Sequence, residues 1–166
     1  MKKICLTLTM AVSLLSICSI GVQAQKTQPK LNQVELMNQF FGTWQNKISD
    51  DTTYTYSIEP FGTGGVGWSK TTTNDKTLSE GRVIIGYDPG TDKIRWAAMK
   101  KGKELVFRVA WFSSDTHWTH LDPLYVSNPE MAPFRIEGDF KSQDMYIENI
   151  IINNKIAQTK TWTRVK

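Results

Sequence analysis

The stretch FRIEGDF, residues 134–140, shows most clearly how this chain folds. Apolar or small residues alternate with charged residues along it, which is the period of a β-strand with one buried face. The same alternation appears at residues 53–60 and 80–88, and a long apolar face runs through residues 104–113. The sequence therefore predicts a protein built from β-strands.

Residues that favour tight turns separate the apolar runs. Examples are Asn74-Asp75-Lys76, Lys101-Gly102-Lys103 and Asn153-Asn154. Runs and turns together predict strands at residues 43–49, 53–60, 65–73, 80–88, 92–100, 104–113, 116–121, 133–141, 144–152 and 155–165. The segment 122–133 contains three prolines and is expected to be a loop across one end of the structure.

Strands joined mostly by short turns are typical of an antiparallel meander, whereas a sandwich needs longer crossovers. Closing the meander on itself removes its unpaired edges. We therefore expect an all-β fold, an antiparallel up-and-down β-barrel of eight to ten strands with a short N-terminal helix. The helix is expected at residues 32–41, where apolar residues recur near a helical period and Asn32 can act as the N-cap.

The first 24 residues are typical of a secretory signal peptide. Lys2 and Lys3 precede an apolar run at residues 4–20, and Ala24 marks the expected cleavage site. A membrane anchor is disfavoured because the run is short and contains Ser and Thr. We expect export to the periplasm or beyond, a flexible tail at residues 25–31 and one barrel domain at 32–166. Lipidation at Cys18 is the minor alternative, since the bulky Ile17 precedes it.

Composition excludes several classes of function. Cys5 and Cys18 both lie in the predicted signal peptide, so the mature chain has no cysteine for a disulfide, a zinc site or a nucleophile. The chain carries 20 basic and 16 acidic residues, a net charge of +4, and loss of Lys2 and Lys3 leaves +2. This small, scattered surplus predicts no nucleic-acid partner, and no membrane span is expected in the mature chain.

Residues at both ends of the predicted barrel resemble a known family. Phe41-Gly42-Thr43-Trp44 follows the expected helix and opens the first strand, and Arg164 lies late on the last strand. This combination resembles the lipocalin-like, calycin-type barrels, and most closely the secreted bacterial members of uncharacterised function. The resemblance implies that Trp44 closes one end of the barrel and that Arg164 packs over its indole ring, both in a structural role.

Aromatic residues on the predicted strands suggest a cavity for a small hydrophobic molecule. Trp96 and Trp111 lie on one predicted hairpin. We expect their side chains to point into the barrel, although the sequence alone does not determine which face of each strand is inward. The predicted lining residues are Tyr56, Trp68, Trp96, Phe107, Trp111 and Trp118. A barrel filled by its own side chains, acting through its outer surface in the cell envelope, is the alternative.

No catalytic residue, metal site or cofactor is predicted. His117 and His120 lie three apart on one expected strand, so they point to opposite faces and cannot chelate one ion. A haem-binding barrel with a single histidine ligand is a less favoured alternative. The glycines at residues 62–67 are followed by a strand-like run instead of a helix, which predicts a turn and not a phosphate loop.

Overall fold

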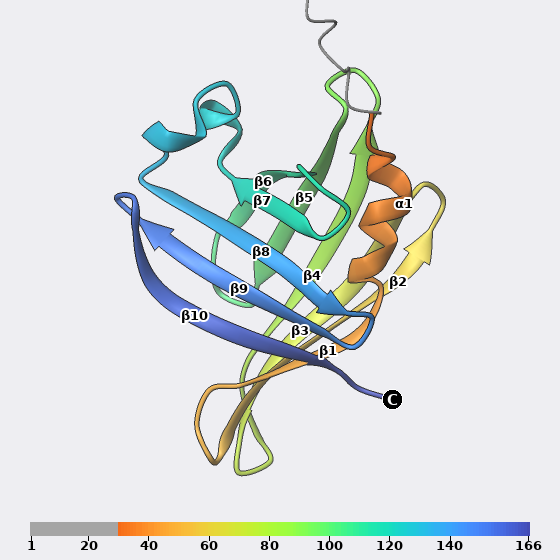
Figure 1. Cartoon of the computed structure of the whole chain (residues 1–166). Coiled ribbons are helices and arrows are strands. Elements are labelled where there is room, and N and C mark those ends of the chain that lie inside the picture. Colours follow the sequence, from red (N-terminus) through yellow and green to blue (C-terminus); the bar gives the residue numbers. More distant parts are fainter. Residues whose placement is uncertain (1–29) are drawn as a thin grey trace, which may run out of the picture. The chain divides into compact units, whose positions relative to one another are not determined.

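A computed structural model describes residues 30–166 of the chain. The predicted signal peptide at residues 1–24 and most of the predicted tail at 25–31 lie outside the described residues. Within them, ten antiparallel strands form a closed barrel (Figure 1). Each strand pairs with its neighbours along the chain, and the last strand pairs with the first. This confirms the predicted all-β, antiparallel up-and-down barrel.

The observed strands agree closely with the predicted ones. They are β1 (Gly42–Lys47), β2 (Thr52–Phe61), β3 (Gly64–Thr73), β4 (Lys76–Asp88), β5 (Lys93–Lys100), β6 (Leu105–Phe112), β7 (His117–Leu121), β8 (Phe134–Ser142), β9 (Met145–Ile152) and β10 (Lys155–Arg164). The largest difference is that β4 begins at Lys76 instead of residue 80. Asn74 and Asp75 have φ of 45° and 62°, which is the tight turn that lets both strands continue to its edge.

A short helix closes one end of the barrel. It consists of α1 (Gln33–Met37) and a 3-10 turn (Asn38–Phe40), and the Asn32 side chain caps it by accepting a hydrogen bond from the Glu35 amide at 3.2 Å. Met37 and Phe40 are buried among the side chains inside the barrel. The predicted helix at residues 32–41 is therefore present.

The Gln33 side chain anchors this helix by making the hydrogen bonds that a neighbouring strand would otherwise make. β5 pairs with β6 only as far as Ala110, so the backbone of Phe112 has no strand partner on that side. The Gln33 amide donates to the Phe112 carbonyl at 2.9 Å and accepts from the Phe112 amide at 2.8 Å. Both buried backbone groups of Phe112 are thereby satisfied.

The seam between β1 and β10 is short. Only Trp44↔Arg164 and Gln45↔Thr163 are paired there, and the buried Asn46 extends the seam by donating from Nδ2 to the Thr161 carbonyl at 2.8 Å. The Arg164 guanidinium lies 4.2 Å from the centre of the Trp44 ring. It also donates to the carbonyls of Phe41, Gln39 (3.2 Å) and Gln143 (2.8 Å). Arg164 thus ties β10 to the segment that leads out of α1.

The proline-rich segment at residues 122–133 joins β7 to β8 and contains two 3-10 turns. The first of these turns contacts β6, and Asp122 lies 3.6 Å from Arg108 of that strand. Val109, Leu121 and Ile151 are buried although strand alternation places them on the outside, and Ala132 of the segment is buried as well. The expected loop is present, with two short 3-10 turns that the sequence did not predict.

Candidate functional site

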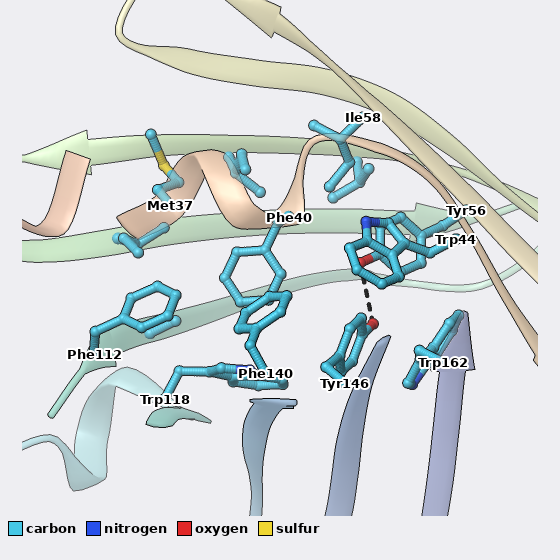
Figure 2. Packing of buried hydrophobic residues seen from close by; sticks show 14 residues of the cluster. Met37, Phe40, Trp44, Tyr56, Ile58, Phe112, Trp118, Phe140, Tyr146 and Trp162 are labelled. Carbon is cyan, nitrogen blue, oxygen red and sulfur yellow. Dashed lines mark hydrogen bonds between the residues drawn. The ribbon is translucent and has the colours of Figure 1, made fainter. Parts of the chain in front are cut away.

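The α1 end of the barrel interior is filled with aromatic and aliphatic side chains (Figure 2). Phe40 lies at the centre, with ring centres 5.2 Å from Trp118, 5.4 Å from Phe140 and 5.9 Å from Trp96. These contacts are edge-on, the arrangement that aromatic rings prefer. Phe40 therefore forms the floor of the interior, the end nearest α1, and the neighbouring aromatic side chains pack against it.

Above this floor the barrel encloses a cavity of about 220 Å³. It opens toward the end opposite α1, where exposed side chains form its mouth. An apolar protein cavity of about 150 Å³ holds benzene, so this one has room for a ring with a short substituent. It is lined by Phe40, Tyr54, Tyr56, Ser69, Arg82, Val83, Trp96, Ala98, Met99, Lys100, Ala110, Trp118, His120, Ile136, Tyr146, Glu148, Lys160 and Trp162.

One wall of the cavity is a group of packed aromatic rings from β2, β9 and β10. Tyr146 and Trp162 stack with ring centres 5.6 Å apart and planes 15° from parallel, and Tyr56 meets Trp162 edge-on at 5.1 Å. The Tyr146 hydroxyl donates to the Tyr56 hydroxyl at 3.1 Å, as Figure 2 shows. Burial raises the pKa of both hydroxyls, so both stay protonated at physiological pH.

A buried ion pair borders the aromatic wall. Lys160 Nζ lies 3.1 Å from Glu148 Oε1, on adjacent positions of β10 and β9. Burial raises the pKa of the Glu148 carboxyl, although Lys160 and the nearby Trp162 indole lower it in part. The contact with Lys160 therefore offsets part of the cost of burying this carboxyl.

Two residues of β7 that line the cavity each carry a buried polar atom without a partner among the described residues. These atoms are the indole N–H of Trp118, whose side chain is buried, and Nε2 of His120 two positions further along the same face. Burial, with a smaller contribution from the Arg108 charge, lowers the pKa of His120 to about 3, so its ring is neutral at physiological pH. Neighbouring side chains bury both atoms almost completely, so leaving them unpaired carries a cost in free energy.

A glycine makes room for the Trp118 ring. Gly138 lies opposite Trp118 on β8, and a Cβ at position 138 would lie 2.3 Å from two ring carbons of the indole. The inward face of residues 134–140 therefore leaves space at Gly138, and the Trp118 indole occupies that space.

Three of the six predicted lining residues contribute to the cavity: Tyr56, Trp96 and Trp118. The other three, Trp68, Phe107 and Trp111, do not, because they lie on the outward phase of their strands. Trp68 is 37% exposed and Phe107 is 60% exposed. Trp111 packs outside under the Lys93 ammonium, 4.6 Å from its ring centre. The expectation that these three face inward was wrong.

Several lining residues were missed by the sequence analysis, among them Tyr54, Tyr146, Glu148, Lys160 and Trp162. For four of them the signal was present in the alternation of β9 and β10. Tyr146 and Glu148 share one face of β9, and Lys160 and Trp162 share one face of β10. The cross-strand pairs Tyr146↔Trp162 and Glu148↔Lys160 join these faces. A fixed register between the strands was needed to use that signal.

The two histidines face opposite sides of β7. His120 lines the cavity, whereas His117 Nδ1 lies 3.1 Å from Asp139 Oδ1 on the outside. Among residues 30–166 no group of three or more metal-ligating side chains is present. A porphyrin does not fit the space, since even drug-sized ligands occupy pockets of about 300–1,000 Å³.

Comparison with known proteins gives no assignment. Neither a scan against models of protein families nor a search of curated proteins finds a match to this chain. In the part of the chain that the structure describes, no helix has the length and apolar character needed to cross a bilayer. Function is therefore argued from the barrel and its cavity.

Proposed function

We propose that this protein is a non-enzymatic binding protein that holds a small, largely hydrophobic molecule inside its barrel. The observation that carries the proposal is the cavity of about 220 Å³ lined mainly by aromatic rings. Burial of apolar surface provides the binding energy, at about 25 cal/mol per Å².

We further propose that the protein is exported and belongs to the lipocalin-like, calycin-type barrels. The first 24 residues support export. The closed up-and-down barrel supports the second part, together with the Arg164 guanidinium over Trp44 at the helix end. A cavity of this size favours ligands of one or two rings, and not long-chain lipids or sterols.

Tryptophan fluorescence tests binding directly. Titration with a neutral one-ring compound, 3-phenylpropan-1-ol, is expected to change the emission saturably and to raise the melting temperature through linkage. The variant Trp96→Phe should lose part of the fluorescence change because Trp96 lines the cavity. The matched variant Trp68→Phe removes an outer-face tryptophan and should keep it.

The absence of any response to 3-phenylpropan-1-ol and its smaller homologues would refute the binding proposal. It would favour the second candidate, a barrel that acts through its outer surface. A specific feature supports that candidate, since Val66, Ile84 and Phe107 lie in one cross-strand row with Ala97 and are 38%, 59% and 60% exposed.

A further inference from the structure

Positive charge exceeds negative charge at the mouth of the cavity. The charged residues in its lining are Arg82, Lys100, Lys160 and Glu148. Glu148 is already paired with Lys160 at 3.1 Å. Within residues 30–166, no carboxylate oxygen lies within 4.0 Å of the charged nitrogens of Arg82 or Lys100. Arg82 alternates with the buried Gly81 and Val83 and pairs with the outward Trp68, so it lies on the outer face. Among the described residues, Lys100 is therefore the cation without an anionic partner that faces the cavity.

Lys100 is the cation that the fold directs over the cavity. It lies on the inward face of β5, and across the sheet its neighbours in the same row are Gly81 on β4 and Ser69 on β3. These small residues leave room for the lysine side chain to cross the mouth. Its Nζ ends 5.4 Å from the ring centre of Tyr54 on β2.

The body of the cavity offers aromatic faces. Trp96, Trp118 and Trp162 line it. The only carboxylate in the lining, Glu148, is held by Lys160. In the described part of the chain, the site thus has one free cation, Lys100, and its lining has no free anionic group for a basic ligand.

We propose that the ligand is a small aromatic carboxylate, with its ring between the indole side chains and its carboxylate beside Lys100 at the mouth. This inference rests on the proposed function and adds the size and the sign of the ligand's charge. The carboxylate stays near water, which avoids the cost of burying an ion, while the ring fills the apolar space. An amine of the same shape meets like charge at Lys100.

Calorimetric titration with three ligands of one shape tests the proposal. The probes are 3-phenylpropionate, its neutral amide 3-phenylpropanamide, and the cation 3-phenylpropylamine. The expected order of affinity is acid, then amide, then amine. The acid should bind about two- to five-fold tighter than the amide at low salt, as expected for one solvent-exposed ion pair, and higher salt should reduce this advantage.

Two lysine variants locate the effect. Lys100→Gln should weaken binding of the acid to the level of the amide and leave the amide unchanged. Lys103→Gln is the matched control, because Lys103 is exposed on the same hairpin outside the cavity lining, and it should leave both ligands unchanged. Lys100 is itself exposed, so its replacement should preserve folding, which the melting temperature checks.

The possible outcomes distinguish failure of the carboxylate proposal from failure of the proposed binding function. Equal affinity for acid and amide, tighter binding of the amine, or an unchanged acid affinity in Lys100→Gln would overturn the carboxylate proposal while the binding function stands. If none of the three probes binds the wild-type protein, both the carboxylate proposal and the proposed function fail.

Discussion

Filling the cavity from its wall tests whether the space is real and whether it is the binding site. Ala98 on β5 lines the cavity, and the next residue back, Ala97, faces outward. Ala98→Leu adds three carbon atoms to the interior. At about 25 Å³ per carbon, scaled from benzene in its cavity of about 150 Å³, they occupy about one third of the 220 Å³.

The free energy of unfolding is expected to rise, because the new side chain removes apolar surface from an unfilled space. Three buried carbons contribute at most about 2 kcal/mol. For a domain of this size that corresponds to a melting temperature higher by about 6–8 °C, less whatever repacking costs. Binding of 3-phenylpropan-1-ol should weaken about tenfold or more, since even one methylene in an apolar pocket changes affinity that much.

Thermal unfolding and calorimetric titration measure the two effects side by side. Ala97→Leu adds the same atoms on the outer face and should change binding little, which makes it the control. A loss of more than about 1 kcal/mol in Ala98→Leu would show a tightly packed interior, where added carbons cause strain. If that loss came with unchanged binding, the cavity would be refuted as the site.

Two further predictions concern the frame around the cavity. Arg164→Met should lower the free energy of unfolding by about 2–4 kcal/mol, since it removes a cation–π contact and several hydrogen bonds to carbonyls. Arg164→Lys should restore little of this stability, because lysine lacks the planar guanidinium group. Urea denaturation measures the free energy of unfolding of both variants. A loss below about 1 kcal/mol in Arg164→Met would contradict the stabilising role of Arg164. Burial lowers the pKa of His120 to about 3 in the folded protein. In the unfolded chain the ring is expected to bind a proton below about pH 6.5, whereas in the folded protein it stays neutral there. Wild-type stability should therefore fall relative to His120→Gln as pH drops from about 6.5 toward 3, and a difference in melting temperature that stays constant with pH would show that the ring is not buried neutral.

Much of the fold follows from local sequence signals. The alternation in FRIEGDF and the asparagine-rich turns act over a few residues, so they set strands and reversals without help from the rest of the chain. Closure of the barrel followed because a long meander has unpaired edges to remove. The N-terminal helix was likewise marked by its cap residue, Asn32.

The lining of the site was less accessible, because the phase of a strand is ambiguous when both faces are apolar. β6 is the clearest case, since Phe107 and Val109 lie outside while Ala110 and Phe112 lie inside. Val109 is buried although it lies on the outer face, a long-range packing effect that alternation does not encode.

The positions of charged residues on the strands were also difficult to predict from alternation alone. Arg108 lies on the strand face of Ala110 and Phe112, 3.6 Å from Asp122 and 5.2 Å from the Phe134 ring centre. The pairing of Glu148 with Lys160 depends on the register of β9 with β10, which shifts between Ile156 and Gln158. Alternation alone does not encode that shift.

The floor of the cavity is not part of the sheet, since Phe40 belongs to the short segment that Gln33 anchors. This segment therefore contributes to the depth of the cavity, whereas the ten strands set its width. A smaller side chain at position 40 is expected to lengthen the cavity toward α1. The length of the cavity can thus vary through a residue that makes no strand pairing.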